Sequence, residues 1–242
     1  MWVVFDVDGV LIDVSGSYDQ AVKLTVEYLL RLFGIEREVK PEWVRELRRK
    51  APSGDDFKVS EALILFSLAG DVEELVEEFP AGGTIDWVRE RFGFEVHDGS
   101  IERVFNTFYL GMEYGGRIFD FPGGLWRRER PIVKRELLEE ASKRFKLGVV
   151  TGRSSLEMEL AERVIGFHFE KAVTRELYLK PDPRALRELV NGEPGVYVGD
   201  TLNDELFIEN YRRKYGGEFD FVMVGREVGG DVNEFLERIL EG

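Results

Sequence analysis

The stretch that decides the fold is Trp2-Val3-Val4-Phe5-Asp6-Val7-Asp8-Gly9-Val10-Leu11-Ile12-Asp13. Its first four residues form a short apolar run, which predicts a strand buried on both faces. Asp6 and Asp8 follow two positions apart, so an extended backbone places both carboxyl groups on one face as the strand ends. Gly9 then allows the chain to turn away. Such a pair can divide the work of nucleophile and proton shuttle, although a solvated strand end gives the same pattern.

Three further segments carry polar residues, and two of them directly follow apolar runs. Thr151-Gly152 comes after residues 147–150, and Gly199-Asp200-Thr201-Leu202-Asn203-Asp204 comes after residues 196–198. The third segment, Lys180-Pro181, lies between them in the sequence. Because the carboxyl ends of parallel strands form the ligand crevice of open α/β sheets, we expect the four segments to converge on one site.

The middle segments favour phosphate as the ligand. The Thr151 hydroxyl and the N–H groups of Gly152 and Arg153 precede a helix predicted from about Ser154, and helix N-termini bind anions. An ordinary helix cap is the alternative for Thr151. The ammonium group of Lys180 could neutralise a phosphate and a carboxylate together, unless it is merely solvated.

The last segment favours a hard divalent metal. Asp200 could ligate Mg²⁺ directly, and Asp204 could ligate through water or orient the other ligands. A helix capped by Asp or Thr, with an acidic first turn, is the alternative.

Composition excludes several classes of site and partner. The 242 residues include no cysteine and only two histidines, His97 and His168, so thiolate chemistry and a histidine-rich metal site are poorly supported. The net charge of −14 argues against a nucleic-acid partner. No apolar run approaches the roughly 20 residues that span a bilayer, and the first residues lack a secretion signal, so we expect a cytoplasmic protein without membrane contact.

The pattern along the chain predicts a split domain. Strands alternate with helices after residue 118, which indicates parallel βαβ units. From about Ser17 to Tyr114 the periodicity is helical throughout, as in Val22, Val26, Leu29 and Phe33. We therefore expect an α/β core of residues 1–15 and 118–242 and an all-helical insert of residues 16–117. The expected helices after the first are 42–50, 55–69, 72–79, 85–92, 100–114 and, in the core, 132–144.

As an ordered set, the four segments resemble the motifs of the haloacid dehalogenase-like (HAD) superfamily of phosphotransferases. Asp6-Val7-Asp8-Gly9-Val10-Leu11-Ile12-Asp13 matches the DxDG(T/V)LxD opening, and Val149-Val150-Thr151-Gly152 matches the second motif. Lys180-Pro181 matches the third, and Gly199 to Asp204 matches the fourth, GDxxxD. The helical insert resembles the cap of the subgroup that includes phosphoglycolate phosphatase and β-phosphoglucomutase. The resemblance implies a Rossmann-like sheet with a helical cap.

The resemblance also implies roles for the motif residues. Asp6 would be the nucleophile that forms an aspartyl-phosphate, and Asp8 would protonate the leaving alcohol and then activate water. The implied phosphate-binding residues are Thr151, Gly152 and Lys180. The implied Mg²⁺ ligands are the Asp6 carboxylate, the Asp8 backbone carbonyl and Asp200, with Asp204 in support.

These roles imply an Mg²⁺-dependent phosphatase that acts on a small phosphorylated metabolite, as a monomer or homodimer. The intact metal pattern disfavours a literal dehalogenase. A phosphomutase would use the same residues, and a non-catalytic phosphate- or metal-binding regulatory protein is a further alternative. We expect the cap to select the substrate, with Arg48, Arg49, Lys50, the loop 51–54 and Lys58 as candidates to hold a second anionic group, although solvated helix-end charges explain each of these cations as well.

Overall fold

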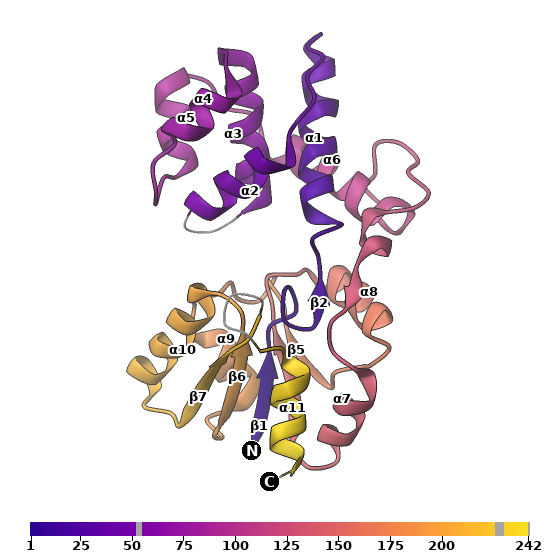
Figure 1. The fold of residues 1–242 in the computed structure, drawn as a ribbon, viewed down its shortest axis with the longest axis vertical. Coiled ribbons are helices and arrows are strands. Elements are labelled where there is room, and N and C mark those ends of the chain that lie inside the picture. Colours follow the sequence, from indigo (N-terminus) through magenta and orange to yellow (C-terminus); the bar gives the residue numbers. More distant parts are fainter. Residues whose placement is uncertain (52–54, 226–229, 242) are drawn as a thin grey trace. The chain divides into compact units, whose positions relative to one another are not determined.

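Strand β1 (Trp2–Phe5) lies in the middle of a parallel five-stranded sheet of order β5-β4-β1-β6-β7. The computed structural model describes residues 1–51, 55–225 and 230–241 (Figure 1). From β1 the chain adds β4 and β5 on one side of the sheet and then returns to add β6 and β7 on the other side. The direction in which strands are added therefore reverses between β1 and β6. The fold class predicted from the sequence is confirmed. The other strands of this sheet are β4 (Lys146–Val150), β5 (Lys171–Val173), β6 (Gly195–Gly199) and β7 (Phe219–Met223).

Helices cover both faces of this sheet. Successive strand residues point to opposite faces, so the apolar run of β1 serves two cores. Val3 and Phe5 pack in one core, and Trp2 and Val4 pack in the other. The helices are α7 (Arg135–Ser142), α8 (Ser155–Ile165) and α11 (Val232–Glu241) on the first face, and α9 (Arg184–Val190) and α10 (Leu202–Tyr215) on the second.

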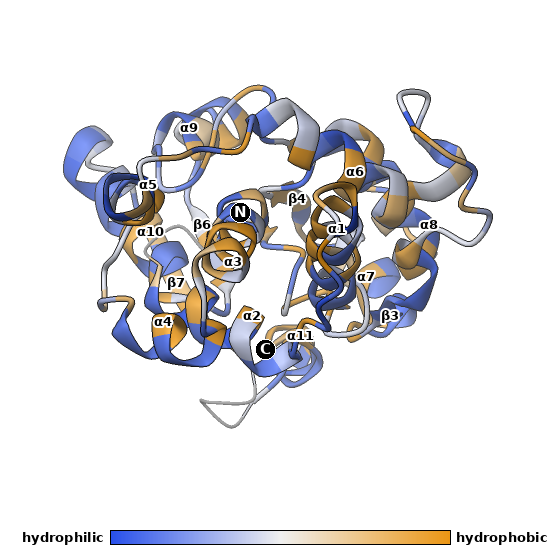
Figure 2. Cartoon of the chain, turned by 90° about the horizontal axis from the view of Figure 1, so that it is seen from above, coloured by the Kyte–Doolittle hydropathy of each residue, from blue (hydrophilic) through white to orange (hydrophobic). Residues whose placement is uncertain are grey.

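Residues 15–128 form a separate, all-helical unit centred on α3. Residues 59–67 of α3 are buried, and α3 contacts the other five α-helices of the unit, which explains its mostly apolar colouring in Figure 2. Neither α3 nor any other helix in the described part of the chain is long and apolar enough to cross a membrane. The six helices are α1 (Tyr18–Leu32), α2 (Pro41–Lys50), α3 (Asp56–Ala69), α4 (Val72–Glu78), α5 (Ile85–Phe92) and α6 (Asp98–Leu110).

Two helix predictions need correction at their ends. Val22, Val26 and Leu29 of α1 are buried as their spacing predicts, but Phe33 is 55% exposed because α1 ends at Leu32. The helix expected to reach residue 114 ends at Leu110 and continues as the 3-10 turn η1 (Gly111–Glu113). Gly111 has a φ of 60°, a positive value that glycine adopts readily and that an α-helix cannot continue through.

The return to the α/β unit is later than the sequence indicated. The structure groups residues 1–14 with 129–242, whereas we expected the core to resume at residue 118. Residues 118–128 stay with the helical unit because Phe119 and Phe121 pack on the rings of Tyr28 and Phe108. The 3-10 turn η2 (Leu125–Arg128) also contacts α1 and α6.

A two-stranded antiparallel sheet, missed by the sequence analysis, joins the two chain segments that connect the units. It pairs β2 (Ile12–Asp13) with β3 (Arg130–Pro131). The adjoining Ile132 N–H donates to the carbonyl of Leu11 at 2.9 Å, so the helix expected from residue 132 starts only at Arg135. The helical unit is therefore inserted between two paired strands.

Candidate active site

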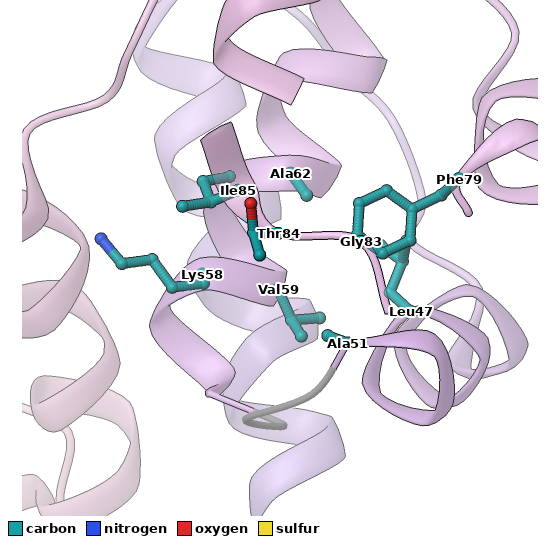
Figure 3. Close-up of a pocket in the computed structure, with 9 residues that line it drawn as sticks. All are labelled: Leu47, Ala51, Lys58, Val59, Ala62, Phe79, Gly83, Thr84 and Ile85. Atoms are coloured by element: carbon teal, nitrogen blue, oxygen red, sulfur yellow. The ribbon is translucent and has the colours of Figure 1, made fainter. Parts of the chain in front are cut away.

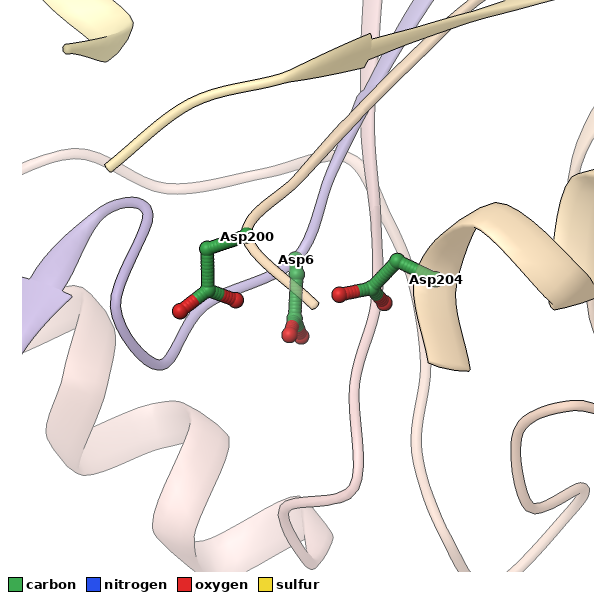
Figure 4. Close-up of side chains that lie close together, drawn as sticks. All are labelled: Asp6, Asp200 and Asp204. Atoms are coloured by element: carbon green, nitrogen blue, oxygen red, sulfur yellow. The ribbon is translucent and has the colours of Figure 1, made fainter. Parts of the chain in front are cut away.

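Three carboxyl groups converge where β1 and β6 end. Asp6 follows β1, and Asp200 and Asp204 follow β6. One carboxylate oxygen from each lies within 4.8 Å of the others. In Figure 4 the carboxyl group of Asp6 lies between those of Asp200 and Asp204. The register explains the convergence, because Asp6 N–H donates to the carbonyl of Val198 at 2.9 Å across the point where the winding reverses.

Lys180 bridges two of these carboxylates. Its Nζ lies 2.8 Å from Oδ1 of Asp6 and 2.7 Å from Oδ1 of Asp204, and it donates to the Tyr197 hydroxyl at 3.2 Å. The Lys180 side chain is only 9% exposed. Burial lowers the pKa of Lys180, but the two carboxylates outweigh burial and hold the pKa well above its usual range. The ammonium group is thus a fixed positive charge beside Asp6.

Both carboxylate oxygens of Asp204 accept hydrogen bonds within the site. Its Oδ1 accepts hydrogen bonds from Lys180 and from the Tyr197 hydroxyl, and its Oδ2 accepts from the hydroxyl and the N–H of Thr201. Burial raises the pKa of Asp204, but Lys180 and the Thr201 hydrogen bonds lower it by more, so the pKa falls below its ordinary value. Thr201 also accepts from the Asp204 N–H and caps α10. Asp204 therefore both caps a helix and holds Lys180.

The environment of Asp6 disfavours its charge. Burial raises the pKa of Asp6 to about 8, with Asp204 and Asp8 adding to the rise and Lys180 opposing it. The Asp6 Oδ1 also accepts from the N–H of Val7 at 2.8 Å. A cation placed against this carboxylate would therefore favour its ionised form.

Asp200 supplies an oxygen atom that a cation could use. Its Oδ1 is buried and has no hydrogen-bond partner within the described residues. A Cβ on Gly9 would lie 2.0 Å from Asp200 Oδ2, so only glycine, here at a φ of 77°, leaves room for this carboxylate. Burial and the neighbouring Asp204 raise the pKa of Asp200 to about 7. An unsatisfied oxygen within a cluster of carboxylates is the donor set of a hard divalent ion such as Mg²⁺, so the residues fit that ion.

Asp8 has a different partner from the other three carboxylates. Its Oδ1 lies 2.8 Å from Nε and 2.6 Å from Nη2 of Arg153, whose side chain is fully buried. The same Nη2 is 3.0 Å from Glu129 Oε2. The Asp8 side chain is 32% exposed and keeps access to solvent.

Thr151 follows β4, but the expected anion site at a helix N-terminus is not present in the predicted form. The Thr151 hydroxyl accepts a hydrogen bond from the Arg153 N–H at 3.1 Å, so that N–H is already used. At the start of α8, the N–H of Ser154 donates to Glu157 and that of Ser155 donates to Glu176. The hydrogen-bond donors that remain as candidates to bind phosphate are therefore the Thr151 hydroxyl, the Gly152 N–H and the Lys180 ammonium group. The N–H groups of Ser154 and Ser155 at the start of α8 are not among them.

The cations expected to hold a second anionic group have acceptors inside the helical unit. Arg48 pairs with Asp19 and Asp56, and Arg49 pairs with Glu46. Lys50 donates to the carbonyls of Val76 and Glu77, and Lys58 pairs with Asp98. These contacts favour the structural interpretation of all four cations. Residues 52–54 of the adjoining loop lie outside the described residues.

The helical unit contains an apolar pocket of its own, of about 200 Å³. Figure 3 shows Phe79 and Leu47 on one side and the Lys58 ammonium directed away from the other lining residues. All nine lining residues belong to the helical unit, so this pocket is distinct from the carboxylate cluster.

The two histidines have local partners. His97 caps α6 by accepting from the Gly99 N–H, and His168 contacts Glu162. Neither histidine belongs to the acidic cluster.

The parallel sheet, the helical insertion after its first strand and the acidic cluster define an α/β protein with a candidate active site at the end of its central strands. A family model of the haloacid dehalogenase-like hydrolases matches residues 1–211. The chain resembles the solved structure of phosphatase Tt82 from Thermococcus thioreducens with a TM-score of 0.91, 78% identity and 100% of both chains covered. The chain belongs to the haloacid dehalogenase-like hydrolases.

More distant structures share the fold alone. CbbY from Rhodobacter sphaeroides, solved with phosphate, matches with a TM-score of 0.53 and 18% identity over 95% of this chain and 91% of that one. No curated protein sequence matches the chain.

Sequence reasoning missed two parts of the site. The guanidinium of Arg153 was not predicted to pair with Asp8 and Glu129, and Tyr197 was considered only as a strand residue. Arg153 directly follows Thr151-Gly152, which is the one sequence signal that could have drawn attention to it.

Proposed function

We propose that the protein is an Mg²⁺-dependent phosphatase that hydrolyses a small phosphorylated metabolite through a phosphoryl group carried on Asp6. The observation that carries the proposal is the carboxylate cluster of Asp6, Asp200 and Asp204, in which Lys180 is buried between Asp6 and Asp204. This arrangement gathers the charges needed to bring an anionic carboxylate and an anionic phosphoryl group together. The similarity to a protein described as a phosphatase supports the same reaction.

In the first step, an Asp6 carboxylate oxygen forms a bond to phosphorus as the bond between phosphorus and the leaving oxygen breaks. Asp8 donates its proton to that oxygen, which departs as an alcohol. In the second step, Asp8 takes a proton from water, whose oxygen bonds to phosphorus as the bond to Asp6 breaks. Inorganic phosphate is released and Asp6 is regenerated.

Thr151, Gly152 and Lys180 are proposed to bind the phosphoryl group. Because the Thr151 hydroxyl already accepts from the Arg153 N–H, its own hydrogen is left to donate to a phosphate oxygen. Lys180 adds a positive charge next to the attacking carboxylate.

Asp6, Asp200 and the backbone carbonyl of Asp8 are proposed to hold Mg²⁺, which would supply positive charge against the transferring group. Asp204 is proposed to support this site indirectly, because both of its oxygens are engaged by Lys180, Tyr197 and Thr201. Since the helical unit interrupts the chain directly after the first motif, we propose that it is a cap that selects the substrate.

The test is phosphate release from p-nitrophenyl phosphate and from a panel of phosphorylated metabolites, with Mg²⁺ or with a chelator. Asp6→Asn should abolish release, and Asp220→Asn is the control because Asp220 is an exposed aspartate of the same unit. Conversion of a sugar 1-phosphate to its 6-phosphate without phosphate release would show a phosphomutase instead. Metal-independent release, or full activity of Asp6→Asn, would refute the proposal.

A further inference from the structure

We infer that Arg153 is a positioning residue that fixes the carboxyl group of Asp8 for proton transfer, and that Glu129 holds Arg153 in place. The inference rests on the proposed function, in which Asp8 moves the proton. It concerns the side chain of Arg153, which reaches Asp8 with two nitrogen atoms.

Burial shows that this ion-pair network is built into the core. The Arg153 side chain is 0% exposed and that of Glu129 is 1% exposed. A buried guanidinium needs carboxylate partners to offset its lost hydration, and Asp8 and Glu129 serve Arg153 in this way. Of Asp8, Arg153 and Glu129, only Asp8 is open to solvent. Arg153 and Glu129 are therefore held in the core, whereas the Asp8 carboxyl group remains accessible to a substrate.

The geometry selects one oxygen of Asp8. Nε and Nη2 of Arg153 both approach Oδ1, at 2.8 and 2.6 Å, so Arg153 leaves Oδ2 for the substrate. A planar guanidinium with two contacts to one oxygen restricts rotation of the carboxyl group more than a single ammonium contact would. Proton transfer needs this control, because a proton donor must lie within hydrogen-bond reach of the leaving oxygen.

The backbone around Arg153 is anchored as well. Its N–H donates to the Thr151 hydroxyl, and its carbonyl accepts from the Arg175 N–H at 3.0 Å. Glu129 directly precedes β3, which pairs with β2, only four residues beyond Asp8. Asp8, Glu129 and Arg153 therefore come from three separate chain segments, and both carboxylates meet at the guanidinium of Arg153.

A purely structural ion pair would stabilise the fold without affecting one substrate more than another. Positioning of Asp8 predicts a dependence on the leaving group, because nitrophenolate departs readily without a proton whereas an alkoxide does not. The informative quantity is kcat/KM, which reports the steps up to phosphoryl transfer and is unaffected by the later attack of water.

The experiment compares kcat/KM for p-nitrophenyl phosphate with that for the best alkyl phosphate of the panel. Arg153→Met should lower the alkyl value by about 100-fold, the low end of what proton transfer contributes, and the nitrophenyl value by less than about 10-fold. Arg153→Lys should recover part of the alkyl activity. The double variant Arg153→Met/Glu129→Gln removes both buried charges and should show the same selective loss if the single variant does not fold.

The matched control is Arg89→Met/Glu61→Gln, because Arg89 and the fully buried Glu61 form a two-contact ion pair in the helical unit. This control should change Tm and leave the ratio of the two kcat/KM values unaltered. Equal losses on both substrates in the folded Arg153 variants would overturn the inference. A wild-type protein inactive on both substrates would instead overturn the proposed function, and the inference with it.

Discussion

Replacing Lys180 by Met tests the electrostatics of the site most severely. Lys180 lies 2.8 Å from Asp6 and 2.7 Å from Asp204, so the substitution leaves two buried carboxylates without their counter-charge. Removing one partner of a buried ion pair costs about 3–5 kcal/mol of unfolding free energy. Because the pKa of Asp6 is already about 8, this group can take up a proton, and we expect the lower end, about 3 kcal/mol.

The same change removes a positive charge from the reacting groups. Loss of one such stabilising group typically lowers kcat by about 10²- to 10³-fold. Urea unfolding and steady-state kinetics measure the two effects, with Lys134→Met as the control because its pair with Glu237 is exposed. The control should lose less than about 1 kcal/mol. If Lys180→Met unfolds like the control and keeps its kcat, the reasoning about buried charge is wrong.

Three other substitutions or conditions test the metal site. Gly9→Ala should abolish Mg²⁺ binding, because the new Cβ would meet Asp200. The control is Gly34→Ala, which should change stability alone, because Gly34 has a similar φ of 75° and a Cβ there would have no atom within 4 Å. Calorimetric titration measures the binding, and Mg²⁺ binding retained by Gly9→Ala would count against the site. Asp200→Asn should lose Mg²⁺ binding. In chelator above pH 7 it should nevertheless unfold at a higher Tm than the wild type, because burial raises the pKa of Asp200 to about 7 and its charge therefore destabilises the fold. A lower Tm than that of the wild type would contradict this. Because the pKa values of Asp6 and Asp200 are raised to about 8 and about 7, the metal-free fold retains protons that the unfolded chain has lost, so its stability should fall as pH rises from 3.8 towards 8. Mg²⁺ should displace these protons and bind more tightly as pH rises to about 8, and titration in buffers of different ionisation enthalpy should detect fewer protons released above that pH.

Much of the fold could be predicted because its signals are local. The apolar run of β1, with Asp6 and Asp8 after it, predicted a buried strand and its polar end from a few residues. Asp200 and Asp204 were predicted in the same way, since residues that end neighbouring parallel strands meet whatever the detail of their side chains.

What failed depends on contacts between distant residues. The approach of Arg153 to Asp8 joins positions 145 residues apart, and no local period encodes it or the pairing of Arg153 with Glu129. The late return from the helical unit follows from the packing of Phe119 and Phe121 on aromatic rings of α1 and α6. For Arg48 of α2 the sequence left a substrate contact and a solvated helix end open, because its acidic partners, Asp19 and Asp56, come from other helices.

The central claim is that Asp6 carries the phosphoryl group, and rapid quenching followed by mass spectrometry of the Asp6 peptide tests it directly. With p-nitrophenyl phosphate, whose leaving group departs without a proton, Asp8→Asn should accumulate the phosphorylated Asp6, because Asp8 is proposed to activate the water that removes the phosphoryl group. The account predicts one phosphoryl group on this peptide during turnover with Mg²⁺, and none with a chelator or in Asp6→Asn. Turnover at the wild-type rate by Asp6→Asn, with no phosphoryl group on the peptide in any variant, would contradict it.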